Sequence, residues 1–263
     1  MGDPLLEKYG PFALVGGACQ GIGLAFARAL AARGFGLALV DRREDLLAPL
    51  ADELARAHGV PAQALALDLG LRSAGARLAE LAAEREIGLG VACAAIGGVG
   101  PFLSEPLEAH RARLAVNCGG PLSLAHALAG PMVERGRGGL ILISSMAGLQ
   151  GTGWVASYAA TKAFDLALAE GLWFELRPHG VDVLALVPGN TDTPGLRSSS
   201  PRKGREGWMR PEDVAAEALE ALGREPVHVC GEANRRVVAA LDRMPREERV
   251  RVMGESTRSL YED

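Results

Sequence analysis

The chain has 263 residues, of which 48% are hydrophobic, and its formal net charge is −4. A chain of this size and hydrophobicity can form one well-packed α/β domain, which we expect to span 1–263. The acidic charge gives no electrostatic reason to expect a nucleic acid or an anionic membrane as a partner.

Cysteine spacing and the N-terminal residues bear on the cellular compartment. The four cysteines form no Cys-x-x-Cys pair and no His cluster accompanies them, so we expect reduced thiols and no metal. Asp3 and Glu7 argue against a signal peptide, and no apolar run approaches the length of a membrane span. We therefore expect a cytoplasmic protein with no membrane partner.

Short apolar runs alternate with helical segments along the chain. The runs are continuous, as is typical of strands buried on both faces, and they cover 12–16, 36–40, 62–67, 88–94, 140–144, 181–187 and 227–230. Helical stretches rich in Ala, Leu, Glu and Arg lie between them, for example at 22–33, 45–57, 107–135 and 155–177. This repetition predicts an α/β fold, a Rossmann-like doubly wound sheet of about seven parallel strands flanked by helices.

A glycine-rich turn joins the first apolar run to the first helical segment. The turn comprises Gly16-Gly17-Ala18-Cys19-Gln20-Gly21-Ile22-Gly23. Glycines let the backbone turn sharply and approach phosphates, and the following helix offers free N–H groups at its N-terminus. We expect Gly17, Gly21, Ile22 and Gly23 to hold the pyrophosphate of a dinucleotide, although glycine-rich turns also form for packing reasons.

Acidic residues end the second and third predicted strands. Asp41 can accept hydrogen bonds from the adenosine ribose hydroxyls and repel a 2′-phosphate, or it can cap the strand end. Arg42 and Arg43 follow and could bind that phosphate, so we favour NAD and leave NADP possible. Asp68 could accept a hydrogen bond from the adenine amino group, or it could start a turn.

Tyr158 and Lys162 stand four residues apart on a predicted helix, so both project from one face. A phenol has a pKa of about 10, and a neighbouring ammonium lowers it by stabilising the phenolate. Tyr158 could then act as acid or base at an alcohol oxygen, although such a pair can also be a simple surface pair. Ser145 ends the preceding strand, where its hydroxyl could bind a substrate oxygen or cap a turn.

These motifs together resemble the short-chain dehydrogenase/reductase family, in its short, single-domain form, over about 12–231. The glycine turn is similar to the family's Thr-Gly-x-x-x-Gly-Ile-Gly, with Gly16 in place of the threonine. Ser145 precedes Tyr158 at a spacing similar to that of the family, and residues 188–193 resemble its Pro-Gly-x-x-x-Thr.

The resemblance implies roles for individual residues. Asn117 would hold a water that links Lys162 to bulk solvent, and Lys162 would also bind the nicotinamide ribose. Pro188 and Gly189 would contact the cofactor, and Thr193 would bind the nicotinamide carboxamide. The implied reaction is hydride transfer between a nicotinamide cofactor and a carbonyl or secondary alcohol, with Ser145, Tyr158, Lys162 and Asn117 as the catalytic residues. The family also implies a homodimer or homotetramer, with 107–135 and 155–177 as contact surfaces.

One segment departs from the family pattern. Where the family has Asn-Asn-Ala-Gly, this chain has Ala92-Cys93-Ala94-Ala95. The change puts the local cofactor packing in question and lends some weight to an alternative, a non-enzymatic dinucleotide-binding sensor or scaffold. The presence of all four catalytic residue types favours an enzyme.

The substrate is expected to be a small, hydrophobic molecule. The stretch 194–210 is long and irregular, as a disordered loop or a lid over a site would be, and we expect a substrate lid with Leu196, Trp208 and Met209. Residues 97–103 and 150–155, including Trp154, would form the other walls. These side chains favour a hydrophobic ketone or alcohol over a small polar sugar.

Overall fold

The computed structural model describes residues 2–199 and 207–261. Among these residues, seven parallel strands form one sheet in the order β3-β2-β1-β4-β5-β6-β7. The strands are β1 (Phe12–Gly16), β2 (Gly36–Asp41), β3 (Ala62–Ala66), β4 (Ile87–Ala92), β5 (Gly138–Ile143), β6 (Val181–Val187) and β7 (Val227–Val229). The predicted Rossmann-like α/β fold is therefore confirmed.

Helices connect the strands and extend beyond the last one. They are α1 (Pro4–Tyr9), α2 (Gly21–Ala31), α3 (Glu44–His58), α4 (Ala74–Glu84), α5 (Leu107–Leu114), α6 (Gly120–Arg135), α7 (Ala156–Leu176), α8 (Pro194–Ser199), α9 (Pro211–Ala221), α10 (Glu232–Leu241) and α11 (Arg246–Tyr261). Short helical turns also occur at η1 (Phe102–Ser104), η2 (Ala115–Gly119), η3 (Met146–Leu149) and η4 (Arg177–His179). None of the helices in the described ranges is long and apolar enough to cross a membrane.

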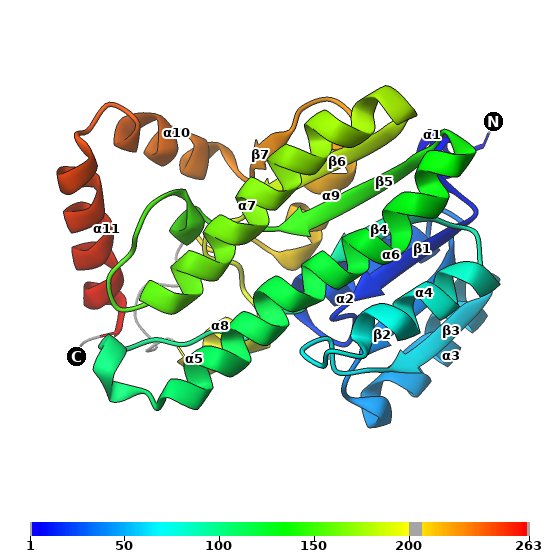
Figure 1. Ribbon diagram of the computed structural model, residues 1–263, viewed down its shortest axis with the longest axis horizontal. Coiled ribbons are helices and arrows are strands. Elements are labelled where there is room, and N and C mark those ends of the chain that lie inside the picture. Colours follow the sequence, from blue (N-terminus) through cyan, green and yellow to red (C-terminus); the bar gives the residue numbers. More distant parts are fainter. Residues whose placement is uncertain (1, 200–206, 262–263) are drawn as a thin grey trace.

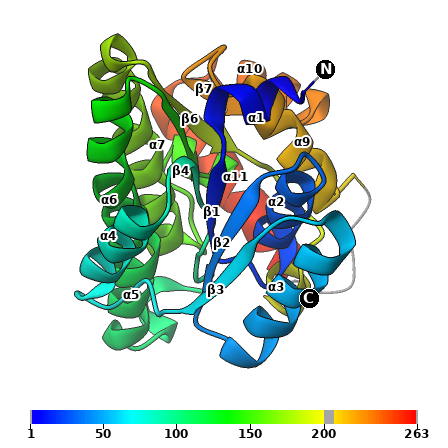
Figure 2. The ribbon, with the colours of Figure 1, turned by 90° about the vertical axis from the view of Figure 1, so that its right-hand side faces the viewer.

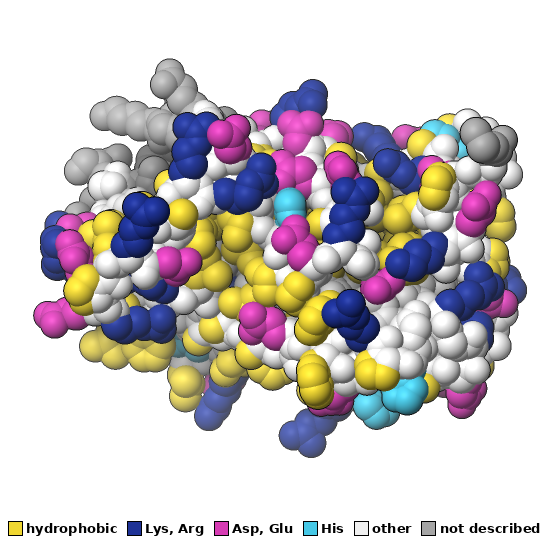
Figure 3. All heavy atoms as spheres, turned by 90° about the horizontal axis from the view of Figure 1, so that it is seen from above, with side chains coloured by type: hydrophobic (Ala, Val, Ile, Leu, Met, Phe, Trp, Pro, Cys, Tyr) yellow, Lys and Arg dark blue, Asp and Glu magenta, His cyan; other side chains and the backbone are white. Residues whose placement is uncertain are grey.

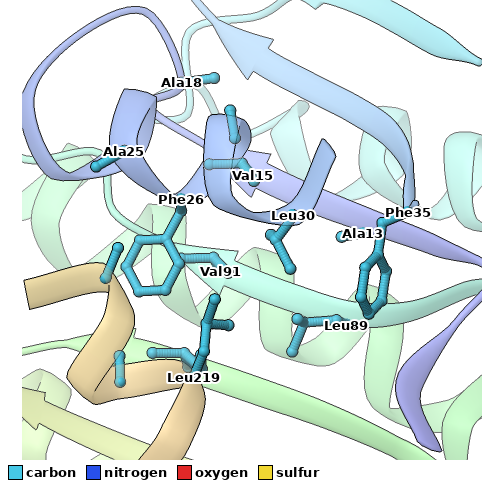
Figure 4. Packing of buried hydrophobic residues seen from close by; sticks show 14 of the residues in the cluster. Ala13, Val15, Ala18, Ala25, Phe26, Leu30, Phe35, Leu89, Val91 and Leu219 are labelled. Carbon is cyan, nitrogen blue, oxygen red and sulfur yellow. The ribbon is translucent and has the colours of Figure 1, made fainter. Parts of the chain in front are cut away.

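Two helical layers cover the sheet, as Figure 2 shows from its side. One apolar cluster joins α2, α3 and α9 to one face, and a second joins α4, α6 and α7 to the other. Phe26 of α2 and Leu219 of α9 meet over Val91 of β4 (Figure 4). The residues of β2, β4 and β5 are all buried, as the continuous apolar runs predicted.

The strand order reverses beside β1, which pairs with β2 on one side and β4 on the other. In open parallel sheets, ligands bind outside the carboxyl ends of the strands at such a switch point. Helices α10 and α11 lie at the end of the molecule toward which the strands point (Figure 1). A ligand site is therefore expected between the strand ends and these two helices.

The predicted helical stretch at 107–135 is confirmed, but its winding changes partway along. A π-helical turn at Ala115–Gly119 separates α5 from α6. The turn points the side chain of Asn117 inward, where it bonds the backbone of Ile96 and the hydroxyl of Thr161. These tertiary hydrogen bonds accompany a local change from α-helical to π-helical winding.

The predicted irregular stretch at 194–210 is also partly helical. Helix α8 begins at Pro194, a favoured first residue, and the Leu196 N–H donates to the Thr193 hydroxyl at 3.2 Å. At the other end of this stretch, the Met209 N–H donates a hydrogen bond to the carbonyl oxygen of Asn190. The intervening part of the predicted lid, 200–206, lies outside the described residues.

Candidate active site

A cavity of about 730 Å³ opens at the carboxyl ends of the strands. It is lined by most of the residues that the sequence predicted for the site, namely Gly17, Gly21, Ile22, Asp41, Asp68, Ser145, Tyr158, Lys162, Pro188, Gly189 and Thr193. Gly23 and Asn117 lie outside this lining. The predicted cofactor and catalytic residues therefore share one space, although they come from segments far apart in the sequence.

The glycine turn has the shape that a phosphate-binding loop requires. Gly17 has a φ of 81°, and a Cβ there would lie 2.7 Å from the backbone of Ala94. Gln20 precedes α2 and makes no side-chain capping bond within the described structure, which leaves the N–H groups of Gly21 and Ile22 available to a ligand. These features fit the pyrophosphate of a dinucleotide.

Gly23 and Cys93 join the glycine turn to the end of β4. A Cβ on Gly23 would lie 2.0 Å from the carbonyl oxygen of Gly17, so this glycine permits close packing rather than lining the cavity. The Cys93 N–H donates to Gly16 O at 3.0 Å, and the Gly23 N–H points to the Cys93 sulfur. Burial raises the pKa of Cys93 to about 12. A neutral thiol therefore ties this region together where the family has amides.

Asp41 already has partners at the end of β2. Its carboxylate accepts hydrogen bonds from Nε and Nη2 of Arg43 and from the Cys19 N–H, each at 3.1 Å. Burial alone would raise the pKa of Asp41, but these hydrogen bonds lower it below its usual value. Arg43 also donates to Gln20 Oε1 at 2.7 Å. An anion and a paired cation thus stand together at the adenosine end of the cavity.

Two other predicted residues make local bonds as well as lining the cavity. Asp68 Oδ1 accepts the Gly70 N–H at 2.8 Å, so the carboxylate does start a turn. Ser145 accepts the Ala147 N–H at 3.2 Å and caps η3. Accepting this bond leaves the Ser145 hydroxyl hydrogen free to donate into the cavity.

Lys162 is buried beside Tyr158. Its Nζ lies 5.9 Å from the centre of the Tyr158 ring, 2.8 Å from Ile143 O and 2.9 Å from Asp165 Oδ2. Burial alone would lower the pKa of Lys162, but Asp165 and Tyr158 raise it above its usual value. Lys162 therefore stays a cation and can stabilise a Tyr158 phenolate.

Asn117 joins the π-helical turn to the loop after β4 and to α7 through its side chain. Its amide nitrogen donates to Ile96 O and to the Thr161 hydroxyl, both at 3.0 Å, and its oxygen accepts the Ile96 N–H at 2.7 Å. The side chain is completely buried and both of its donor hydrogens are used. It holds the π-helical turn against α7, and the proposed water relay remains a prediction.

A buried arginine that sequence reasoning missed supports one wall. Arg113 is 2% exposed and bonds Gly97 O, the Glu105 carboxylate and the Ser157 hydroxyl. His110 bonds the same Ser157 hydroxyl at 2.9 Å. This network connects the loop after β4 to the residue preceding Tyr158, so it fixes the wall relative to the candidate acid/base.

Helix α11 supplies a wall that sequence reasoning also missed. Its residues Met253, Ser256, Thr257 and Tyr261 line the cavity, as do Asn234 and Val237 of α10. Elsewhere the lining combines apolar side chains, namely Val99, Val116, Met146, Val155, Leu196 and Trp208, with polar ones that include Thr152, Asn190, Thr191 and Ser199. Of the predicted walls, only 97–99, Thr152 and Val155 from the two ranges line the cavity; 100–103, 150, 151, 153, 154 and Met209 do not, and Leu103 is 92% exposed.

The comparisons with known proteins agree with this arrangement. The family profile described as short chain dehydrogenase matches residues 11–204. The 7beta-hydroxysteroid dehydrogenase of Clostridium sardiniense is 32% identical over 250 residues, which cover 94% of this chain and 96% of that protein. Because the family profile matches most of the chain, the protein belongs to the short-chain dehydrogenase/reductase family. It is thus a dehydrogenase that uses NAD or NADP and acts on CH–OH groups.

Solved structures resemble the chain over almost its whole length. A structure from work on 7beta-hydroxysteroid dehydrogenase stereoselectivity has a TM-score of 0.86 and 32% identity, and covers 95% of this chain and 98% of its own. A short-chain dehydrogenase from Sphingobium yanoikuyae in complex with NADPH has a TM-score of 0.81 and 31% identity, with coverages of 88% and 92%. These similarities include the C-terminal region beyond the matched family profile.

Proposed function

We propose that the protein transfers a hydride between a nicotinamide cofactor and a bulky, hydrophobic ketone or secondary alcohol. The proposal rests on one observation: Ser145, Tyr158 and Lys162 line the same cavity as the glycine turn, and large apolar side chains such as Leu196 and Trp208 line it with them. A non-enzymatic dinucleotide-binding module would have no use for these three side chains together.

Each side chain has a distinct part in this reaction. The bound nicotinamide supplies the hydride in reduction and accepts it in oxidation. In reduction, Tyr158 donates its hydroxyl proton to the substrate oxygen, while Ser145 donates a hydrogen bond to the same atom. Lys162 stabilises the resulting phenolate through its ammonium charge. In oxidation, the Tyr158 phenolate accepts the alcohol proton.

The substrate class follows from the walls and from the relatives. Apolar side chains from the loop after β4, from α8 and from α11 line the same cavity as Tyr158, as Val99, Leu196 and Met253 do. Relatives at about a third identity include a hydroxysteroid dehydrogenase, which acts on a rigid polycyclic alcohol. We infer that a polycyclic or similarly bulky alcohol is preferred over a small sugar.

We further propose NAD as the preferred cofactor. Asp41 is ionised and lines the cavity, where its charge would repel the 2′-phosphate of NADP. Arg43 could attract that phosphate, but both oxygens of Asp41 already bond it. The carboxylate therefore neutralises the cation that NADP would need.

Residues 1–263 are proposed to act as one catalytic domain within a homodimer or homotetramer. The predicted contact stretches 107–135 and 155–177 form α5, α6 and α7. Each of these helices exposes a large apolar side chain that a partner subunit could cover: Leu114 (49% exposed), Leu122 (48%) and Phe174 (76%). Acidic and basic side chains intermingle over the face in Figure 3, so this face carries no continuous basic patch of the kind that binds nucleic acids. Light scattering that gives a monomeric mass would contradict the oligomer.

A substrate panel tests the proposed function. The protein is mixed with NAD or NADP and with hydroxysteroids, aromatic and aliphatic secondary alcohols, and sugars, and the reduced nicotinamide is followed by absorbance. The proposal expects turnover of bulky hydrophobic alcohols with NAD. Turnover confined to sugars would contradict the substrate class.

A further inference from the structure

Asp165 is a buried carboxylate that the proposed reaction does not use. It lies on α7 three residues after Lys162, its side chain is 0% exposed, and it is absent from the cavity lining. Oδ2 accepts from Lys162 Nζ at 2.9 Å, whereas Oδ1 is buried and no donor within the described ranges reaches it. Burying a carboxylate with one unsatisfied oxygen is costly, and apolar packing would avoid that cost.

The donors of Lys162 show what this carboxylate does. An ammonium has three N–H donors, and Ile143 O and Asp165 Oδ2 accept two of them. One donor remains for the cavity, on the side of the Tyr158 ring. The two buried acceptors therefore fix the direction in which Lys162 meets a ligand.

We propose that Asp165 is a positioning residue that directs the free N–H of Lys162 into the cavity and cancels its positive charge. Its expected effect on the pH profile of kcat/KM rests on the function proposed above. Lys162 contacts the reacting groups, and Asp165 acts through Lys162.

Counting charges predicts how Asp165 affects proton loss from Tyr158. With Asp165 ionised, the group of Tyr158, Lys162 and Asp165 is neutral and becomes an anion when the phenol ionises. Without that charge, and as long as Lys162 keeps its proton, the group is a cation and becomes neutral when the phenol ionises. A buried site favours the neutral state, so removing the charge of Asp165 eases proton loss.

The size of the effect follows from the distances. Asp165 Oδ2 lies 2.9 Å from an ammonium that is itself 5.9 Å from the Tyr158 ring centre, so the carboxylate oxygen is at most about 9 Å from the ring centre. With an effective dielectric constant of about 20, one charge at this distance shifts a titration by about one pH unit.

Other titratable groups near Lys162 and Asp165 do not change this net charge. Cys93 at the end of β4 and Cys118 in η2 face Lys162 and Asp165, and burial raises their pKa values to about 12 and about 11, so both thiols are neutral below that range. On α5 and the loop before it, His110, Arg113 and Glu105 gather around Ser157. They bond one another and Ser157 instead of Lys162.

The test compares the native chain with Asp165→Asn and with Glu170→Gln, which removes an exposed carboxylate from the same helix. Tyrosinate formation is followed by ultraviolet difference absorbance against pH, and the Tyr158 component is isolated by subtracting the titration of Tyr158→Phe. In Asp165→Asn the Tyr158 midpoint is expected about one pH unit lower, with the same shift in the pH profile of kcat/KM for alcohol oxidation. Glu170→Gln and the charge-conserving Asp165→Glu should keep the native midpoint.

The absorbance titration needs no substrate, so it separates this proposal from the proposed function. An unshifted or higher Tyr158 midpoint in Asp165→Asn would overturn the role of Asp165, even if turnover fell. Asp165→Val also removes the charge and replaces Asp165→Asn if that variant does not fold. Absence of turnover in the native chain, together with the lower midpoint, would overturn the proposed function and leave the role of Asp165 supported.

Discussion

Replacing Asp41 with alanine should reverse the cofactor preference. The change removes the anion from the adenosine end of the cavity and releases the Arg43 guanidinium, which bonds both oxygens of Asp41 in the native chain. A freed arginine gains a charge-assisted bond to a 2′-phosphate, worth about 1.5–3 kcal/mol. Loss of the repulsion between the Asp41 carboxylate and that phosphate adds to this gain, less the part that solvent screens.

After allowance for screening, we expect a total change of about 2–3 kcal/mol, or about 30- to 160-fold in the ratio of kcat/KM for NADP to that for NAD. The assay measures initial rates with both cofactors on one alcohol. Arg43→Ala is the control, because it keeps Asp41 and should retain the NAD preference. An unchanged ratio in Asp41→Ala, or an NADP preference in the native chain, would refute the reasoning.

Two further predictions concern stability and the walls of the site. Arg113→Met breaks the buried bonds to Glu105 and Ser157, so it should lower Tm by about 6–10 °C and raise the substrate KM; an unchanged Tm would contradict this. Burial opposes the ionisation of Glu217, but the Gly231 N–H and other donors lower its pKa below the ordinary 4.5. The hydrogen bonds to the Glu217 carboxylate therefore stabilise the fold fully above pH 4.5, and this stabilisation is lost as the pH falls through the lowered pKa. Glu217→Gln should lower Tm by about 2 °C at pH 7, and a difference that persists at acid pH would contradict this assignment.

Much of the sheet could be predicted because buried parallel strands give continuous apolar runs. The expected strands 12–16 and 181–187 match β1 and β6 at both ends. The glycine turn and Tyr158 were also recognisable, since short-range spacing defines them. Local patterns thus located the strand ends that surround the cavity.

The rest depended on contacts between distant segments. The π-helical turn is accompanied by bonds from Asn117 to Ile96 and Thr161, which no helix propensity reveals. The charged periodicity of α11 predicts a helix but not its position over the cavity. One signal was available for Asp165, because an acidic residue three positions after Lys162 must share its helix face.

The central claim is that Tyr158 is the proton-transfer group of a dehydrogenase. Tyr158→Phe removes only the hydroxyl, so the glycine turn and the apolar wall should remain intact. The most direct measurement is kcat/KM for the best alcohol of the panel, together with NAD affinity by fluorescence titration. We expect the variant to lose at least about 100-fold in kcat/KM and to keep near-native NAD affinity. Full turnover in Tyr158→Phe would contradict the mechanism.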